Sequence, residues 1–444
     1  MTTESAVGVE AKLCDLFDIL GIGQAHIVAG GPPALTDWYG LATLHPERIA
    51  SLTLSSPPIL DTAELAGLAS RLLVVAGDQG TGARGAAGLL ADLPGVASHI
   101  LRGYDWEPWS DVIAERGSEI GPALLDFLDR HPTPAVAPPE GEGETAGITW
   151  RVRGAGPPLV LLPLALAPSQ WEPLIPILSA RYRTISLGGP LLGIIGVLEA
   201  RGRSNYLTLV RNVLDLVAIR PGEVVLEVGG GSGVVVRDIA NRTGGANRVI
   251  DVDINPYLLR EAAALAKQAG LADRITFQEG HAEALPLADN SVDVALSFTV
   301  MEEGDADRML AELLRVTRPG GRIAAIVRAT DMPSWVGLPI SAAIRAKVDQ
   351  PGMVNAGVAP GGCADASLYQ RFAAAGLTRL TCFPQLVAIT EDEISRATII
   401  KRRLGGTLTG AEADEWRSTV ARADAERTFF VASSHHCAVG TKPS

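Results

Sequence analysis

The stretch EVVLEVGGGSGVVVRDIA, residues 223–240, decides the fold of the second half of this 444-residue chain. It opens with a short apolar run, residues 224–228, of the kind that forms a buried strand. The glycine-rich turn GGGSG follows at 229–233, and a second apolar stretch begins directly after it. Strand, glycine turn and helix in this order predict a parallel α/β unit whose turn lets a ligand approach the backbone closely.

A glycine turn alone is a weak signal, because several nucleotide-binding folds and plain tight turns share it. The spacing of the segments after the turn is more specific. A second apolar run, residues 248–253, ends in Asp253, where a carboxylate can accept both hydroxyls of a ribose. Further strands are expected at 275–279, 292–298 and 321–327, with an amphipathic helix at 306–316. This alternation predicts an α/β fold with a doubly wound parallel sheet.

Four motifs, in order and at suitable spacing, resemble those of the class I S-adenosylmethionine-dependent methyltransferases, in particular the group that includes the ubiquinone and menaquinone methyltransferases. They are LEVGGGSG at 226–233, VIDVDINPYLL at 249–259, EGHAEALPLADNSVDVALS at 279–297 and LLRVTRPGGRIAAI at 313–326. The tail, residues 427–443, is similar to that family's terminal antiparallel hairpin. The resemblance implies a methyltransferase domain with a Rossmann-like seven-stranded sheet over residues 201–444. An NAD-binding Rossmann unit is the alternative for the glycine turn, but the third motif and the tail fit it poorly.

The resemblance also implies where S-adenosylmethionine binds. The implied contacts are Glu227, Gly229, Gly231 and Gly233 at the methionine end, Asp253 on the ribose, Ile254 and Ala282 at the adenine, and Ser297 and Phe298 near the sulfonium. One position departs from the family, which usually has an acid where this chain has His281. A neutral imidazole there can accept a hydrogen bond from the adenine amino group. The alternative is that His281 only caps a turn and the backbone of Ala282 contacts the adenine.

Methyl transfer from a sulfonium depends mainly on alignment and exclusion of water. A general base is needed only if the acceptor must lose a proton. Candidates are Glu302, Glu303, His435, His436 and Tyr206. One of the two glutamates is expected to be a solvated helix start, and the two histidines alternate along a predicted strand, so at most one faces a pocket. Tyr206 either closes over the cofactor or packs in the core.

Residues 328–363 carry Met332, Trp335 and Met353 among proline and glycine breaks. This composition predicts a lid over a small apolar or aromatic acceptor, at the place where the resembled family binds its acceptor. The alternative is that this long segment only packs against the rest of the domain and binds no acceptor.

The first half resembles the α/β-hydrolase family, but with its parts in a different order. AHIVAGGPPAL at 25–35 is similar to the family's turn around the nucleophile, whereas the opening strands of that fold are similar to residues 148–189. We therefore expect regions 1–131 and 147–200 to form one circularly permuted domain. Residues 132–146, rich in proline, glycine and glutamate, are predicted to be a linker.

The residues that would make this first domain a hydrolase are missing. Gly31 stands at the nucleophile position and is followed by Pro32 and Pro33, which lack the N–H groups of an oxyanion hole. Gly103, Tyr104 and Asp105 stand where the catalytic histidine is expected. The first domain is therefore predicted to be non-catalytic and to shape the pocket or an oligomer.

Composition limits the remaining possibilities. Hydrophobic residues make up 47% of the chain and the net charge is −12, which argues for a globular protein and against a nucleic-acid groove. The four cysteines are scattered, so neither disulfides nor a metal site are expected. No signal peptide or membrane span is recognised, which favours the cytoplasm. The predicted function is methylation of a small-molecule acceptor, by a protein that could form a homo-oligomer. Alternatives are a non-catalytic S-adenosylmethionine-binding scaffold and, less in keeping with the sequence, a hydrolase.

Overall fold

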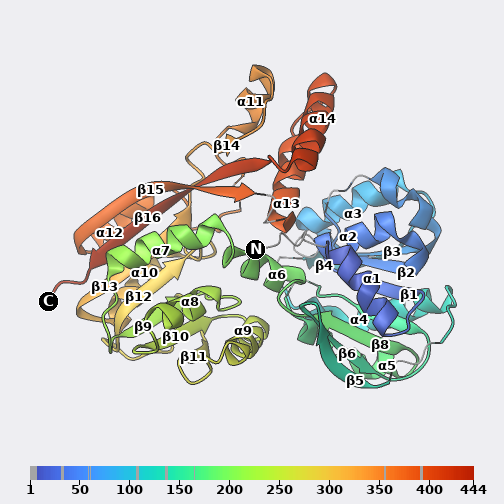
Figure 1. The fold of residues 1–444 in the computed structure, drawn as a ribbon, viewed down its shortest axis with the longest axis horizontal. Coiled ribbons are helices and arrows are strands. Elements are labelled where there is room, and N and C mark those ends of the chain that lie inside the picture. Colours follow the sequence, from blue (N-terminus) through green and yellow to red (C-terminus); the bar gives the residue numbers. More distant parts are fainter. Residues whose placement is uncertain are drawn as a thin grey trace. The chain divides into compact units, whose positions relative to one another are not determined.

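The computed structural model describes residues 8–31, 35–58, 60, 62–106, 110–135, 139–164, 166–354, 357–390 and 394–444. The chain divides into two compact units, Met1–Val197 and Leu198–Ser444. Each unit contains one mixed sheet of eight strands with helices on both faces (Figure 1). The protein is thus α/β throughout, and each unit is considered by itself.

The sheet of the first unit has the order β4-β3-β2-β1-β7-β8-β6-β5. Its strands are β1 Ala25–Ala29, β2 Ile49–Ser55, β3 Leu72–Gln79, β4 Ala97–Asp105, β5 Gly141–Thr145, β6 Ile148–Arg153, β7 Pro158–Leu161 and β8 Arg183–Gly188. β1 pairs in parallel with β2 on one side and with β7 on the other. All five residues of β1 are buried, as expected for a central parallel strand. The stretches before and after the proline-rich segment therefore share one sheet.

Helices cover both faces of this sheet. They are α1 Val9–Ile19, α2 Leu35–Leu44, η2 Pro46–Arg48, η3 Thr62–Arg71, α3 Gly80–Asp92, α4 Val112–Asp129, η4 Pro168–Trp171 and α5 Ile175–Ser179. The next helix, α6 Gly193–Arg201, begins in the first unit and ends in the second. One core gathers residues of α1, α2 and α3, including Phe17 and Trp38. The other gathers residues of α4 and α5 with Trp171.

The predicted linker differs from the structure in one respect. Its last part, Gly141–Thr145, forms β5, which pairs antiparallel with β6 at the edge of the sheet. Backbone hydrogen bonds hold this strand without apolar burial, which explains why a composition of glycine and glutamate concealed it. Val136, Ala137 and Pro138 of the same segment lie outside the described residues.

The sheet of the second unit has the order β11-β10-β9-β12-β13-β16-β14, and β15 pairs with β16. Its strands are β9 Val224–Val228, β10 Arg248–Asp253, β11 Ile275–Glu279, β12 Val292–Phe298, β13 Thr317–Arg328, β14 Trp335–Val336, β15 Thr378–Thr390 and β16 Phe430–Thr441. β9 to β13 pair in parallel, whereas β16 runs antiparallel to β13. The two-residue β14 is an eighth strand beyond the seven predicted.

The helices of this unit are α7 Asn205–Val217, α8 Val234–Arg242, α9 Pro256–Gln268, α10 Ala306–Val316, α11 Ala342–Val348, α12 Ser367–Ala374, α13 Ile394–Gly405 and α14 Ala411–Glu426. Residues of α7 and α8 form one core with the sheet, and residues of α10 and α12 form another. α13 and α14 are inserted between β15 and β16, so the tail is one strand rather than the local hairpin predicted (Figure 1).

The inserted helices belong to a small separate core. Residues of β14, α11, α13 and α14 pack together around Ile344, Leu404, Trp416 and Phe429. We call these four elements the cap. Their packing shows that the segment after β13 and the segment after β15, far apart in sequence, form one body.

No helix among the described residues combines the length and the apolar character needed to cross a bilayer.

The pairing of β1 with β7 leads to a prediction about fragments. Residues 1–131 alone would leave both the β7 edge of β1 and half of the α4 core exposed, so this fragment is expected not to unfold cooperatively. Residues 1–197, which restore β5 to β8, are expected to show a cooperative thermal transition. Calorimetry of the two fragments checks this, and a cooperative transition in the 1–131 fragment would contradict a shared sheet.

Candidate cofactor and acceptor site

The glycine turn after β9 has a backbone that other residues adopt only with strain. Gly229, Gly231 and Gly233 have φ values of +74°, +58° and +74°. A Cβ on Gly229 would lie 2.3 Å from a methyl carbon of Val300, and one on Gly231 would lie 2.9 Å from a methyl carbon of Leu198. The turn is therefore closed to side chains, and it leads into the N-terminus of α8, where backbone N–H groups are available.

Two carboxylates from β10 hold this turn. The N–H of Gly231 donates to Asp253 Oδ2 at 2.9 Å, and the N–H of Gly230 donates to Asp251 Oδ1 at 3.2 Å. Asp253 Oδ1 also accepts from the N–H of Asn255 at 2.9 Å. A carboxylate oxygen has two lone pairs, so Asp253 keeps acceptor capacity for the hydroxyls of a ligand.

Glu227, next to this turn, lacks a complete set of partners. Its side chain is 3% exposed, and Oε2 is buried with no hydrogen-bond partner among the described residues. Burial raises the pKa of Glu227 well above its usual range, and the negative charges of Asp251 and Asp253 raise it further. A buried carboxylate oxygen without a partner is costly, so its presence indicates a ligand group with a donor or a positive charge.

The predicted adenine end is open. Ile254 is 56% exposed, which leaves its surface available for a flat ring. His281 is also exposed, and its carbonyl accepts from the N–H of Ala284 at 3.0 Å in a tight turn. Both hypotheses for His281 are compatible with this geometry. Ala282, beside it, is half-buried.

At the end of β12, the residues next to the glycine turn come two positions later than the sequence analysis predicted. Phe298 is buried in the same core as Tyr206 and Val210, and Ser297 is 2% exposed. The following Thr299 has φ +60°, and Val300 lies against Gly229. Thr299 and Val300 are residues next to the glycine turn that the sequence analysis missed, because a strained backbone at a threonine leaves no pattern in sequence.

The two glutamates that follow β12 have different environments. Glu303 is exposed, whereas Glu302 is fully buried. Glu302 Oε1 accepts from the backbone N–H of Arg328 at 2.7 Å and lies 3.3 Å from its Nε, while Oε2 has no hydrogen-bond partner among the described residues. Burial raises the pKa of Glu302, and the positive charge of Arg328 opposes this rise. Glu302 is thus a second buried acid with a vacant oxygen at the same edge of the sheet.

Tyr206 lies in the same region of the second unit as these two acids. Its side chain is 3% exposed, and the Arg201 guanidinium carbon lies 5.2 Å from its ring centre. Burial raises the pKa of Tyr206, and the negative charges of Glu227 and Glu302 also act on its hydroxyl, so all three groups are neighbours. Arg201, which the sequence analysis did not single out, therefore belongs to this cluster.

The two histidines of β16 face opposite sides, as their alternation predicts. The ring of His435 lies 6.0 Å from that of Tyr206, on the side of the cluster. His436 is held between the hydroxyl of Tyr369, 2.7 Å from Nδ1, and Asp331 Oδ1, 2.8 Å from Nε2. Both nitrogens of His436 are thus engaged on the other face, while His435 is the histidine next to Tyr206.

Residues 357–363 of the predicted lid are hydrogen-bonded to the segment that carries Glu302. The carbonyl of Glu302 accepts from the N–H of Ala359 at 2.8 Å, and the N–H of Cys363 donates to Met301 at 2.8 Å. Met353 packs on the core of the cap, whereas Trp335 is 54% exposed and contacts Phe430 edge-on. The segment after β13 thus borders the edge where the vacant acids lie.

Gly31, which follows β1 in the first unit, has no room for a nucleophilic side chain. A Cβ on Gly31 would lie 2.6 Å from the carbonyl oxygen of Ser56, so no side chain fits there. Tyr104 stands where the catalytic histidine of a hydrolase is expected. Its hydroxyl donates to Glu115 at 2.6 Å, so Tyr104 does not act as a base. Pro32 and Pro33 lie outside the described residues. This geometry does not support hydrolysis.

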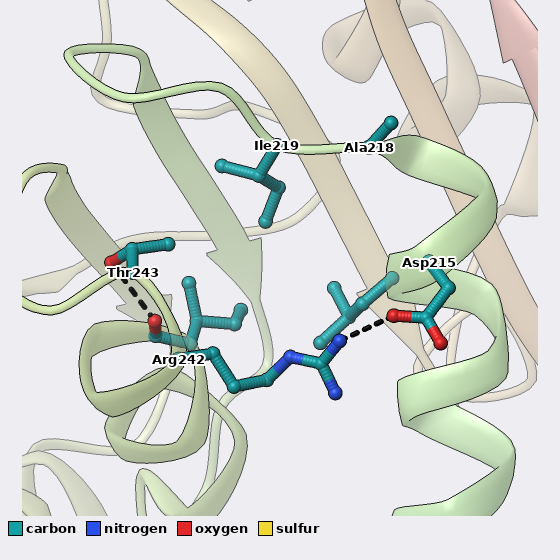
Figure 2. A pocket seen from close by; sticks show the side chains of 7 residues that line it. Asp215, Ala218, Ile219, Arg242 and Thr243 are labelled. Atoms are coloured by element: carbon teal, nitrogen blue, oxygen red, sulfur yellow. Dashed lines mark hydrogen bonds and ion pairs between the residues drawn. The ribbon is translucent and has the colours of Figure 1, made fainter.

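A pocket of about 240 Å³ lies at the opposite ends of the strands of the second unit, where α7 and α8 finish (Figure 2). Figure 2 shows Arg242 reaching across it to form an ion pair with Asp215. Because its charges are already paired and it is remote from the glycine turn, it is not the candidate site. No cluster of metal-ligating side chains occurs in the part of the chain that the structure describes.

Residues 225–321 match a family model described as "Methyltransferase domain". The second unit contains a methyltransferase domain. Its matched segment holds the glycine turn, Asp253 and Glu302, and the cofactor of this class of domain is S-adenosylmethionine. The orphaned oxygen of Glu227 and the side-chain-free turn fit that cofactor. The prediction of a methyltransferase is confirmed at this level.

Relatives with curated names share this segment. The ubiquinone/menaquinone biosynthesis C-methyltransferase UbiE of Hahella chejuensis is 32% identical over 148 residues, which are 31% of this chain and 59% of that protein. UbiE of Legionella pneumophila (strain Corby) is 33% identical over 129 residues, covering 29% and 51%. The chain spans about half the length of the curated relatives it matches.

Solved structures also match. The [4+2]-cyclase SpnF shares 22% identity over 55% of this chain and 85% of that one, with a TM-score of 0.35. The YcgJ protein from Bacillus subtilis shares 17% identity over 54% and 98%, with a TM-score of 0.37.

The raised pKa of Glu227 leads to a prediction about stability. A carboxyl whose pKa is raised by folding stabilises the protein fully below its ordinary pKa of about 4 and loses that contribution as pH rises through its native value. Glu227→Gln, which stays neutral, should therefore gain stability relative to the unliganded wild type between pH 5 and pH 8. Calorimetric melting curves measure this, with the exposed Glu279→Gln as control. A constant difference between wild type and E227Q over this range would contradict the assignment.

Proposed function

We propose that the protein transfers a methyl group from S-adenosylmethionine to a small apolar or aromatic acceptor. The observation that carries this proposal is the set of groups that meet where β9 and β10 end. There the glycine turn, a buried Glu227 with a vacant oxygen and an Asp253 that accepts from the N–H of Gly231 coincide with the matched methyltransferase segment.

The cofactor supplies an already activated methyl group, so the chain needs only to bind, orient and dehydrate the reactants. In this proposal the glycine turn and Glu227 hold the methionine end, Asp253 the ribose, and Ile254 with Ala282 and His281 the adenine. Ser297 and Phe298 shape the end of β12 from within the core. Thr299 and Val300 line the passage between the cofactor and the acceptor.

Glu302 is the group we assign to the acceptor. It is buried, it has one free oxygen, and its raised pKa makes it a stronger base than an exposed carboxylate. Its bonded oxygen is fixed by Arg328, so the free oxygen has a defined position. An acceptor with a phenolic or enolic proton would place that proton on Glu302 as the methyl group arrives. Tyr206 and His435 border the same space, whereas Glu303 is exposed and His436 is engaged elsewhere.

The curated relatives are named for ubiquinone and menaquinone biosynthesis, which makes a hydroxylated aromatic ring a reasonable acceptor class to test. The cap and the segment after β13, with Trp335 and Met353, supply apolar surface beside the acceptor edge. A hydroxylated aromatic acceptor is thus proposed together with the methyl transfer.

The first unit is proposed to be a circularly permuted, non-catalytic α/β-hydrolase body. If the chain is counted from β5 instead of β1, its sheet order becomes 1-2-4-3-5-6-7-8, which is the strand order of an α/β-hydrolase sheet. The antiparallel β5–β6 pair then falls at the start, where that fold has it. The steric block at Gly31 supports a role as scaffold or oligomer surface rather than as an enzyme.

The cofactor assignment predicts a loss of binding in Asp253→Ala. Charge-assisted hydrogen bonds to a ribose contribute roughly 1.5–3 kcal/mol, so S-adenosylhomocysteine should bind about ten- to a hundredfold more weakly. Isothermal titration calorimetry measures this. The exposed Asp289→Ala serves as a control that should bind as the wild type does. Wild-type affinity in D253A would contradict the assignment.

The base assignment predicts that Glu302→Gln retains S-adenosylhomocysteine affinity within about threefold but loses about a hundredfold or more in turnover. Tritiated S-adenosylmethionine with a panel of phenols and quinols provides the assay, and Glu303→Gln is the matched control. The wild-type rate should rise with pH through the raised pKa of Glu302, and this rise should vanish in E302Q. Equal rates for the two variants would remove Glu302 from the mechanism, and cofactor binding without transfer to any acceptor would favour a scaffold.

A further inference from the structure

His436 is a buried histidine that the proposed methyl transfer does not use, and both of its ring nitrogens have partners. Its side chain is 4% exposed. Asp331 Oδ1 lies 2.8 Å from Nε2, and because a carboxylate only accepts, Nε2 carries the proton. In the neutral ring, Nδ1 then accepts from the hydroxyl of Tyr369 at 2.7 Å. A buried polar network whose members are all satisfied holds its neighbours in one arrangement.

Asp331 lies three residues beyond the end of β13 and ties this stretch of chain to two other elements. Val327 is the residue of β13 that pairs with His436, so Asp331 reaches back along the strand to the histidine. Its other oxygen, Oδ2, accepts from the N–H of Ala366 at 3.1 Å, immediately before α12. Burial acts to raise the pKa of Asp331, but these hydrogen bonds outweigh it, so the pKa is lowered and the carboxyl is ionised at neutral pH.

The two residues before Asp331 are fixed in the same way. The N–H of Ala329 donates to the carbonyl of Ser434 in β16 at 3.0 Å. The N–H and the hydroxyl of Thr330 both donate to the carbonyl of Ala364, at 2.7 and 2.8 Å. We call residues 329–331 the stem. The segment 332–363 leaves the sheet at the stem and returns beside it, so these contacts close its base.

Arg328, the last residue of β13, joins the stem to Glu302. The parallel pairing of β12 with β13 ends at Phe298 and Ile326. Beyond that point the N–H of Arg328 donates to Glu302 Oε1 at 2.7 Å, so a side chain takes the place of a strand carbonyl. The end of a strand frays unless the chain that follows it is held. The position of the Glu302 carboxylate therefore depends on the contacts of the stem.

We propose that His436 is a positioning residue for the proposed reaction: through Asp331 it holds the stem, and the stem holds the N–H of Arg328 against Glu302. The inference rests on the role proposed for Glu302 and adds what keeps its free oxygen in place for the acceptor. His436 acts only through Asp331 and is not a catalytic residue. Displacing a reacting group by about 1 Å can lower a rate about a hundredfold, so a contact at this distance matters for turnover.

Two substitutions of His436 separate its two contacts. The amide nitrogen of glutamine reaches the position of Nε2, so His436→Gln keeps a donor for Asp331. Asparagine reaches only the position of Nδ1, so His436→Asn keeps an acceptor for Tyr369 and loses Asp331. Tyr369→Phe is the matched control, because it removes the other hydrogen bond of the same ring. Asp331→Ala removes the stem contact from the half-exposed side and replaces H436N if that variant does not fold.

Native-state hydrogen exchange of the full-length chain measures the effect directly, because the Arg328 amide is the donor to Glu302. Its protection is compared with that of Leu226 in β9, which reports global unfolding. In H436N and D331A the protection of Arg328 relative to Leu226 should fall about ten- to a hundredfold, as for the loss of one hydrogen bond to a charged group. In H436Q and Y369F it should stay within about threefold of the wild type.

Turnover supplies a second measurement. In the tritium assay H436N should lose about tenfold or more in rate, while its affinity for S-adenosylhomocysteine stays within about threefold. Burial raises the pKa of Glu302, and Arg328 opposes this rise. With Arg328 less well placed, the pKa of Glu302 should increase, so the rise of the rate with pH should move to higher pH in H436N and not in H436Q. A loss of overall stability would not move this profile.

The outcomes separate the inference from the function on which it rests. Unchanged protection of Arg328 in H436N and D331A, or an equal loss in H436Q and Y369F, would overturn the inference and leave the role of Glu302 untouched. Loss of protection in H436N with a wild-type rate and pH profile would overturn it as well. If the exchange results are as expected but E302Q is as active as the wild type, the role proposed for Glu302 is wrong, and the inference falls with it.

Discussion

The ligand edge of the second unit depends on two backbone N–H groups of the glycine turn that are held by carboxylates of the neighbouring strand. The parallel register of β9 and β10 sets Val228 opposite Val252, so the turn after one strand and the acids at the end of the other meet at the same edge. Asp251 and Asp253 then bind Gly230 and Gly231. A Cβ on Gly230 would lie 2.2 Å from Asp251 Oδ1, so the contact with Asp251 requires a glycine there.

This arrangement buries more negative charge than the chain neutralises. Burial and mutual repulsion raise the pKa of both Glu227 and Asp251. Buried carboxylate oxygens without a hydrogen-bond partner among the described residues occur on Glu227, Asp251 and Glu302. Native proteins rarely leave such atoms without partners, and where they do, a ligand commonly supplies them. In the function proposed above, the vacancies on Glu227 and Glu302 mark the cofactor end and the acceptor end of one site.

The first unit shows that the segments before and after residues 132–146 form one sheet. β1 is central because parallel strands need partners on both sides, and β7 supplies one of them from more than a hundred residues later in the chain. The order of strands in space is independent of where the chain begins, so a permuted sequence can fill the same positions. At Gly31, however, the carbonyl of Ser56 fills the space that a nucleophile would need.

Much of the second unit could be predicted from the sequence, because its parallel strands are short apolar runs and its glycine turn has a local backbone requirement. Glu227, Asp253 and the glycines are recognisable for that reason. The sequence by itself determined the α/β fold class and the methyltransferase domain of the second unit, and it shows a glycine at position 31. The tertiary structure alone decided what depends on contacts between distant segments. It paired β1 with β7, assembled the cap from two insertions, buried Glu302 while leaving Glu303 exposed, and brought Arg201 over the ring of Tyr206. Burial and charge proximity are properties of packing, and no local pattern of residues records them.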